Sequence, residues 1–291
     1  MHIPVLTEKI LEYTDPKPNE NFIDCTGGGG GHTFQIAERT APKGKILVLD
    51  WDAKAIAVLK NEVAKRKLQN RITLVQENFA HVQDVARQYA FQPIAGILFD
   101  LGFSSDQLER ERGLSFQKDE ILDMRYSDEN PITAQKIVNY SSRNELERIL
   151  EEYGEEQFAE KIAQAIVQNR REKPITRTAQ LVAIIQNATP KSYHTKKINP
   201  ATKTFQALRI ATNNELKNIA QGLKGAQNIV APNGKIAVIS FHSIEDRIVK
   251  EFFKSQESLR AITKKPITPS DMEIKNNSRA RSAKLRVAIK L

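Results

Sequence analysis

Short apolar runs alternate with amphipathic helical patterns along the first hundred residues of the chain. Four runs are typical of buried strands, and they span residues 21–24, 45–50, 71–76 and 95–100. Between the strands, apolar side chains recur three or four positions apart, as on one face of a helix, over residues 33–38, 53–67 and 82–89. This alternation predicts an α/β fold with a mostly parallel, doubly wound sheet.

The alternation stops after Asp100. From about residue 108 to 200 no strand pattern is present, and helical patterns follow one another over residues 132–139, 143–153, 155–170 and 178–187. Later patterns predict a long helix over 205–230, a strand over 235–240, a helix over 244–254 and closing strands over 259–263 and 284–291. We therefore expect one domain built from residues 1–107 and 201–291, with an all-helical insertion, residues 108–200.

Five consecutive glycines, Gly27–Gly31, separate the first strand pattern from the first helix pattern. Because glycine has no Cβ and allows positive φ, such a backbone can turn sharply and lie flat against a ligand. A strand, a glycine turn and a helix start form the nucleotide-binding half of a βαβ unit. The strict G-x-G-x-x-G pattern fails here, because His32 or Thr33 takes the third glycine position, which argues against NAD and FAD. A tight turn without a ligand is the alternative.

Polar and aromatic residues follow each predicted strand. Asp50 lies 19 residues beyond Gly31 and can accept hydrogen bonds from ribose hydroxyls. Since the carboxyl ends of parallel strands meet at one edge of the sheet, we expect Asp24, Asp50, Phe79 and Asp100 to converge there. S-adenosylmethionine fits this set, because it has a nucleoside, no pyrophosphate, and a carboxylate for the amides at the helix start. For Phe79, contact with adenine and ordinary core packing are both open.

The net charge of +9 favours a polyanionic partner, although a plain solvated surface is the alternative for each basic cluster. The clusters are Arg170, Arg171, Lys173, Arg177, Lys191, Lys196, Lys197 and Lys203, and, near the C-terminus, Arg279, Arg281, Lys284 and Arg286. The single cysteine, Cys25, excludes an internal disulfide and a cysteine-based zinc cluster, and we expect no metal site. The absence of an export signal and of an apolar run of about 20 residues predicts a cytoplasmic protein.

Several longer motifs occur in the order typical of one family. They are residues 24–32, 100–107, 112–116, 122–125, 153–156, 200–209, 240–247 and 278–282. On these residues nearly the whole chain resembles the bacterial ribosomal RNA small subunit methyltransferase H family, also called MraW. That family methylates N4 of a cytidine in the decoding region of small-subunit ribosomal RNA. The resemblance implies a class I (Rossmann-like) methyltransferase fold with a helical domain inserted after the fourth strand.

The resemblance also implies a cofactor, its binding residues and a partner. The cofactor is S-adenosylmethionine, held by Gly30, Gly31, His32, Asp50, Phe79, Asp100 and Gln107. The partner is small-subunit ribosomal RNA, within the small ribosomal subunit or a late assembly intermediate, with no membrane involved and with an oligomer left open.

Transfer of a methyl group to cytosine N4 needs help, because the amine lone pair is delocalised into the ring. A hydrogen-bond acceptor on the amine N–H would take up developing positive charge. Asp100, Ser104 and Ser105 lie on the loop where such an acceptor is expected, with Asp100 primarily a cofactor ligand. Simple turn chemistry is the alternative for both serines. Phe103, where the family usually has valine, could stack on the cytosine or pack in the protein.

Two further groups of residues are candidates for substrate binding. His242, Glu245 and Asp246 follow the strand over 235–240 and could shape the target pocket. Alternatively they form a helix start, with Ser243 as N-cap and Asp246 near the helix dipole. The insertion and the basic C-terminus, including Arg279 and Arg281, would hold the RNA backbone.

Three rival functions remain open on the sequence. The first is a methyltransferase that acts on adenine N6 or on a small molecule. The second is an NAD-dependent dehydrogenase, against which the failed glycine pattern argues. The third is a non-catalytic RNA-binding or assembly factor.

Overall fold

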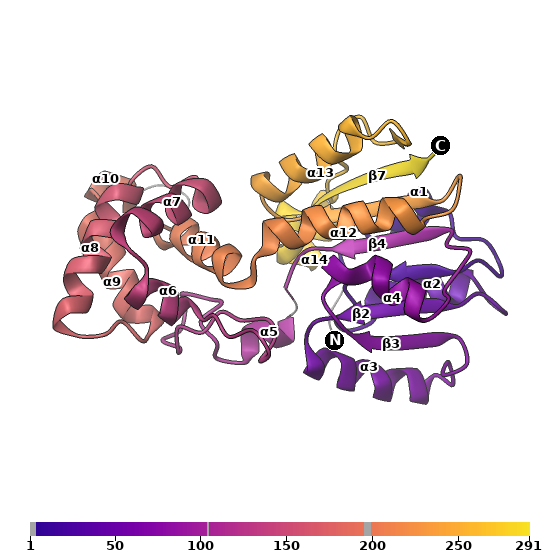
Figure 1. Cartoon of the computed structure of the whole chain (residues 1–291), viewed down its shortest axis with the longest axis horizontal. Coiled ribbons are helices and arrows are strands. Elements are labelled where there is room, and N and C mark those ends of the chain that lie inside the picture. Colours follow the sequence, from indigo (N-terminus) through magenta and orange to yellow (C-terminus); the bar gives the residue numbers. More distant parts are fainter. Residues whose placement is uncertain (1–3, 104, 195–198) are drawn as a thin grey trace. The chain divides into compact units, whose positions relative to one another are not determined.

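The computed structural model describes residues 4–103, 105–194 and 199–291. The chain divides into two compact units. The sheet unit contains residues 1–104 and 216–291, and the helical unit contains residues 105–215. Figure 1 labels the elements of both units, which are described separately below.

A seven-stranded sheet forms the centre of the sheet unit, in the order β3-β2-β1-β4-β5-β7-β6 (Figure 1). Its strands are β1 (Phe22–Asp24), β2 (Ile46–Asp50), β3 (Ile72–Gln76), β4 (Gly96–Asp100), β5 (Lys235–Ser240), β6 (Leu259–Ala261) and β7 (Lys284–Lys290). Strands β1 to β5 are parallel, and β7 runs antiparallel to both of its neighbours. The expected mostly parallel, doubly wound sheet of the class I methyltransferase fold is thereby confirmed.

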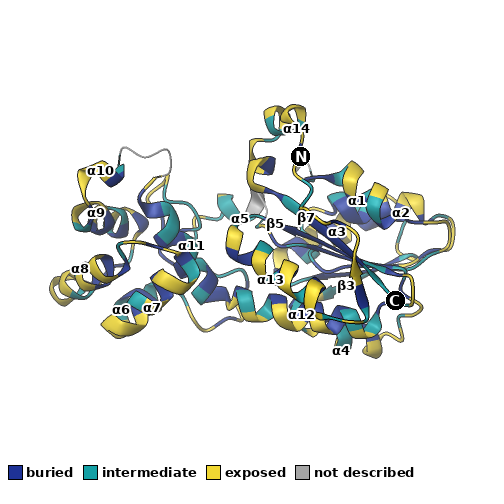
Figure 2. Cartoon of the chain, turned by 90° about the horizontal axis from the view of Figure 1, so that it is seen from above, coloured by how far each residue is buried: buried dark blue, intermediate teal, exposed yellow. Residues whose placement is uncertain are grey.

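Helices cover both faces of this sheet. They are α1 (Thr7–Thr14), α2 (Gly31–Arg39), α3 (Ala53–Lys65), η1 (Phe79–His81), α4 (Val82–Gln88), α12 (Glu215–Ile229), α13 (Ser243–Ser255), α14 (Asp271–Asn276) and η2 (Ser278–Ser282). Successive strand residues face opposite sides, so Leu47 and Leu49 pack with α4, α12 and α13, whereas Ile46 and Val48 pack with α1, α2 and α3. Burial on both faces explains why β2 and β4 are continuous apolar runs, and Figure 2 shows the inner strands of the sheet mostly in dark blue.

The helical unit has its own core. Its helices are α5 (Ser105–Glu109), α6 (Ala134–Tyr140), α7 (Arg143–Gly154), α8 (Ala159–Glu172), α9 (Thr178–Ala188), α10 (Lys191–His194) and α11 (Ala201–Asn213). Leu146, Leu150, Ile162, Ile166 and Leu208 are fully buried in that core. Within its described residues, β pairing is limited to one isolated bridge between Ile121 and Arg177. The predicted absence of strands is confirmed for residues 108–194 and 199–200, which the structure describes.

One predicted element is wrong. The single helix expected over residues 205–230 is two helices, because α11 ends at Asn213 and its C-cap, Asn214, has a φ of 53° in the left-handed region. Asparagine tolerates that conformation better than most residues, so it can end a helix without a glycine. Among the described residues, no helix is long and apolar enough to cross a bilayer.

The strand order determines where a ligand can bind. From β1 the chain continues to β2 and β3 on one side and then returns to β4 on the other side of β1. Ligands of such sheets bind at this switch point, outside the carboxyl ends of the strands. Asp24, Asp50 and Asp100 are the last residues of β1, β2 and β4, so all three lie at the ligand edge.

Candidate active site

The loop between β1 and α2 lies at the switch point and depends on its glycines. Gly28 and Gly30 have φ values of 49° and 79°, which residues with a Cβ rarely adopt. At Gly27 a Cβ would lie 2.6 Å from Val48 Cγ1 and 2.7 Å from Leu59 Cδ1, so this backbone rests directly on the core. Packing and conformation together therefore require glycine here.

Asp24 ties this loop to helix α2. Its Oδ2 accepts a hydrogen bond from the Thr33 hydroxyl at 2.6 Å, and its Oδ1 accepts one from the Thr26 N–H at 3.1 Å. The side chain is buried, and burial raises the pKa of Asp24, an effect that the Thr33 bond opposes. Asp24 lies at the expected edge, and its contacts hold the loop in shape.

Asp50 reaches across from β2 to the same loop. Its Oδ2 accepts the Gly28 N–H at 2.7 Å, and its Oδ1 accepts the Asp52 N–H at 2.8 Å. Burial raises the pKa of Asp50 to about 6, although both backbone hydrogen bonds favour the ionised form. Each carboxylate oxygen can accept a second hydrogen bond, so ribose hydroxyls can still bind here.

His32 and Asp100 face each other at the switch point. Asp100 is held by its own N–H, which donates to Thr26 Oγ1 at 2.8 Å. His32 Nε2 lies 3.6 Å from Asp100 Oδ2, which is too far for a hydrogen bond. Within the described residues, neither ring nitrogen of His32 nor Oδ1 of Asp100 has a hydrogen-bond partner, although all three atoms are buried.

The unpaired atoms of His32 and Asp100 indicate whether a polar ligand fits the site. A buried polar atom without a partner costs about 1–3 kcal/mol, so folded proteins rarely leave several together. A ligand with donors and acceptors at the switch point would satisfy the His32 and Asp100 atoms. S-adenosylmethionine has an amino group, a carboxylate and ribose hydroxyls, so the residues present fit this cofactor.

Phe79 occupies the position expected for it, after β3. Its ring packs edge-on against Phe99, with 5.7 Å between ring centroids, and it leaves no room for a Cβ at Gly222 of α12. The ring is half-buried, so part of it faces outward. Core packing of Phe79 is therefore confirmed, while its contact with adenine stays a prediction.

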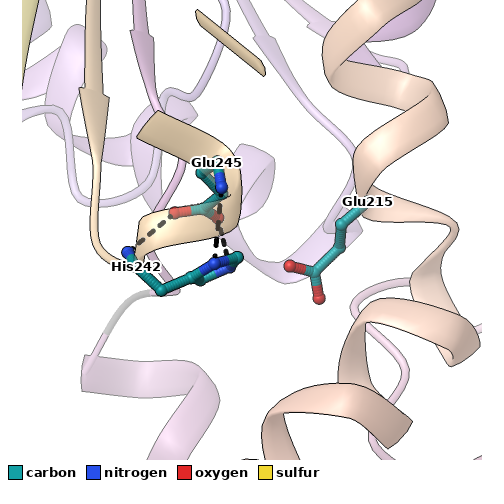
Figure 3. Close-up of side chains that lie close together, drawn as sticks. All are labelled: Glu215, His242 and Glu245. Atoms are coloured by element: carbon teal, nitrogen blue, oxygen red, sulfur yellow. Dashed lines mark hydrogen bonds and ion pairs between the residues drawn. The ribbon is translucent and has the colours of Figure 1, made fainter. Parts of the chain in front are cut away.

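His242 begins helix α13, where Figure 3 shows its ring beside Glu245. The Nδ1 of His242 accepts the Glu245 N–H at 3.4 Å, and Glu245 Oε2 accepts the N–H groups of Phe241 and His242 at 2.8 and 3.3 Å. This reciprocal capping makes His242 the N-cap, so the prediction that Ser243 caps the helix is wrong by one residue.

Asp246 follows in the first turn of α13 and pairs with Arg286 of β7. The two hydrogen bonds are 2.6 and 3.0 Å long. Glu245 and Asp246 therefore have structural partners, as the helix-start alternative expects. A contact between His242 and the target base stays a prediction.

The remaining predicted residues are spread over the chain. Phe103 follows β4 and is half-buried, Arg279 and Arg281 are exposed on η2, and Gln107 lies on α5 in the helical unit. Ser104 lies outside the described residues, as do Lys196 and Lys197 of the basic cluster, and Ser105 begins α5. The roles expected for all of these residues stay predictions.

Two threonines of the site were missed by sequence reasoning. Thr26 joins the end of β1 to the end of β4, and Thr33 joins α2 to Asp24. Both lie in or beside the glycine run, and the Thr26 N–H bonds the aspartate two positions earlier, as in an Asx turn. The two-residue spacing of Asp24 and Thr26 was the sequence signal that could have identified Thr26.

Comparison with known proteins gives a consistent result. The model of the MraW methylase family matches residues 1–291. The ribosomal RNA small subunit methyltransferase H of a Sulfurihydrogenibium species is 47% identical over 289 residues, which are 98% of this chain and 98% of that protein. The protein of the same name from Thermosipho melanesiensis is 45% identical over 291 residues, covering 99% of this chain and 97% of its own.

Proposed function

Since the chain belongs to the MraW methylase family, we propose that it transfers the methyl group of S-adenosylmethionine to N4 of a cytidine in the decoding region of small-subunit ribosomal RNA. The observation that carries the proposal is the group of unpaired buried atoms of His32 and Asp100 at the switch point. They lie beside a glycine loop at the switch point, whose backbone can lie close to a ligand.

Three segments of the sheet unit would hold the carboxylate, the ribose and the adenine of the cofactor. The backbone of Gly30 and Gly31 and the ring of His32 stand at the start of α2, where N–H groups favour a carboxylate. Asp50 would accept the ribose hydroxyls, and Phe79 would lie against the adenine. When bound, the cofactor supplies an electrophilic methyl group on its sulfonium sulfur.

The protein's task toward the target is to position it. Correct orientation of two reacting groups can supply up to roughly 7–11 kcal/mol of the barrier reduction. The loop after Asp100 would orient the cytosine amine through acceptors on Asp100, Ser104 and Ser105. Phe103 on the same loop would stack on the base, which must leave its own stack to reach the edge of the sheet.

The RNA would be held beside this edge by the basic C-terminal segment. Lys284, the first residue of β7, pairs with Ser240, the last residue of β5. The exposed Arg279 and Arg281 on η2 directly precede Lys284, so they lie at the end of the sheet where the cofactor site is. The proposal places the reaction in the cytoplasm, on the small ribosomal subunit or a late assembly intermediate.

The test is methyl transfer to subunits that lack the modification. Small subunits from cells without this protein are incubated with the purified chain and tritiated S-adenosylmethionine, and the RNA is digested to nucleosides. We expect the label in N4-methylcytidine, and no label with subunits from cells that contain the protein. Label in N6-methyladenosine would replace the proposed target, and cofactor binding without transfer to any RNA would favour a non-catalytic factor.

A further inference from the structure

A long-range hydrogen bond joins the C-terminal segment to the N-terminal one. The Oε1 of Glu273, in α14, accepts the N–H of Leu6 at 2.6 Å, although the two residues are 267 positions apart. Both residues belong to the sheet unit. The bond therefore fixes α14 against the start of α1.

The hydrogen bond to Glu273 stabilises the backbone conformation of Leu6. It is the N-cap of α1, with φ 54° and ψ 28°, and its side chain provides no cap. The left-handed region is unfavourable for leucine, and a helix start favours a negative charge. The Glu273 carboxylate supplies both the acceptor and the charge, while the buried side chains of Val5 and Leu6 anchor the segment in the core.

The N-terminal segment in turn supports the cofactor loop. Pro4 packs on the backbone of Gly31, where a Cβ would lie 2.8 Å from both Cβ and Cγ of Pro4. Gly31 is the first residue of α2, between Gly30 and His32. A shift of Pro4 would therefore move the backbone amides expected to bind the cofactor.

Through its backbone carbonyl, Glu273 is also hydrogen-bonded to the segment that leads into η2, which carries Arg279 and Arg281. The Asn277 N–H donates to the Glu273 carbonyl at 2.7 Å, and the Arg279 N–H donates to Asn277 Oδ1 at 3.3 Å. The Ala280 N–H donates to the Asn277 carbonyl at 3.0 Å, and Ala280 is buried. Helix α14 and η2 thus form one connected body.

We propose that Glu273 is a positioning residue for the cofactor loop and that it couples RNA contact at η2 to the affinity for S-adenosylmethionine. The proposal rests on the function proposed above. RNA held by Arg279 and Arg281 fixes η2 and α14, the Glu273 bond fixes Leu6, and Pro4 then holds Gly31 in its binding position. Because coupling between two sites is reciprocal, the cofactor strengthens RNA binding by the same factor.

The test measures cofactor affinity of the full chain by titration calorimetry, with and without an RNA oligonucleotide of the target sequence. For the wild type we expect RNA to tighten cofactor binding at least about fivefold. Glu273→Ala should weaken cofactor binding several-fold and abolish the increase in cofactor affinity that RNA causes in the wild type. Glu273→Gln keeps an acceptor oxygen and should retain most of the affinity.

Asp271→Ala is the matched control, because Asp271 is an exposed carboxylate on the same helix. This variant should behave as the wild type. If Glu273→Ala melts at a lower temperature but keeps both the cofactor affinity and the gain from RNA, Glu273 is merely structural and the proposal is wrong. That result would leave the proposed function intact if the variant still methylates subunits, whereas a wild type that binds no cofactor would overturn both.

Discussion

The two units differ in where their charges lie. The helical unit, residues 105–215, has 17 Lys and Arg against 17 Asp and Glu, so it is neutral overall. The entire net charge of +9 lies in residues 216–291, which hold 15 Lys and Arg against 6 Asp and Glu. We therefore expect a polyanion to be attracted more strongly to the C-terminal part of the sheet unit than to the helical unit.

Two arginines of the basic cluster expected in the helical unit already have partners within the protein. Arg177 pairs with Asp119 at 2.6 Å, and Arg170 donates to the Val138 carbonyl at 2.7 Å. Phosphate contacts position a nucleic acid, whereas shape and specific contacts select it. We therefore expect the sheet unit to provide affinity for the RNA backbone, and any contact of the helical unit with RNA to contribute selectivity.

The units differ in how their unpaired buried polar atoms are grouped. Among the described residues, His32 and Asp100 keep three such atoms together at the site, whereas in the helical unit the hydroxyls of Thr204 and Thr212 are unpaired and Asn213 is paired through both ends of its amide. Its Oδ1 accepts the Tyr126 N–H at 2.9 Å, and its Nδ2 donates to the Met124 carbonyl at 2.8 Å. Several unpaired atoms of a carboxylate and a histidine ring at one place are thus consistent with a ligand site, whereas the paired amide of Asn213 is part of the scaffold.

Removing a carboxylate at the site should have the largest effect. Asp100→Ala should lower the single-turnover rate constant for methyl transfer by about 10²–10³-fold, because it removes the carboxylate that we propose to orient the cofactor and the cytosine amine. This rate constant is measured by single-turnover methylation of small subunits at saturating cofactor. Asp84→Ala, an exposed aspartate of the same unit, is the control and should leave the rate unchanged. An unchanged rate in Asp100→Ala would remove this residue from the mechanism.

A buried pair in the helical unit should matter for stability alone. The Tyr193 hydroxyl lies 3.0 and 3.2 Å from the two carboxylate oxygens of buried Glu156, and burial raises the pKa of Tyr193 above its usual value. Tyr193→Phe leaves that carboxylate short of a donor and should cost about 1–3 kcal/mol in the free energy of unfolding. Urea denaturation measures it, and cofactor affinity should not change.

The control for this substitution is Tyr140→Phe, since Tyr140 is 83% exposed on the same unit. Its unfolding free energy should stay within about 0.5 kcal/mol of the wild type. A loss of cofactor affinity in Tyr193→Phe would contradict the division of roles between the two units.

The sheet and its ligand edge were predictable because buried parallel strands are continuous apolar runs with polar residues after them. Asp24, Asp50 and Asp100 converge for that reason alone. The glycine run revealed the loop, since few other functions require such a backbone. Thus most of the cofactor site follows from local sequence patterns.

The features that sequence reasoning missed have no local pattern of that kind. The break at Asn214 is hidden because apolar periodicity continues through it into α12. Histidine is an uncommon N-cap, so Ser243 looked the better candidate than His242. The bond between Glu273 and Leu6 joins opposite ends of the chain, and only the folded structure brings them together.

The pKa of Asp50 predicts a pH dependence of cofactor binding. In the proposed site ribose hydroxyls would donate to the ionised carboxylate, and burial raises the pKa of Asp50 to about 6. Affinity should therefore be constant above that pH and fall as pH decreases through it, by about tenfold at one unit below the pKa. Calorimetric titrations between pH 5 and 8 measure this. The Asp50→Asn variant should bind the cofactor weakly at every pH. If its affinity still varies with pH as in the wild type, the titration belongs to another group.

The charge comparison itself can be tested with two matched pairs of arginines. Each phosphate contact on single-stranded RNA contributes about 0.7 to the slope of log affinity against log salt, so Arg279→Ala with Arg281→Ala should lower that slope by about 1.4. Arg170→Ala with Arg171→Ala removes the same charge from the helical unit and should change the slope little, because that unit is neutral overall. Fluorescence anisotropy with labelled target RNA at several salt concentrations measures both. Equal decreases from the two pairs would mean that local basic clusters, and not the net charge of each unit, determine where the RNA backbone is held.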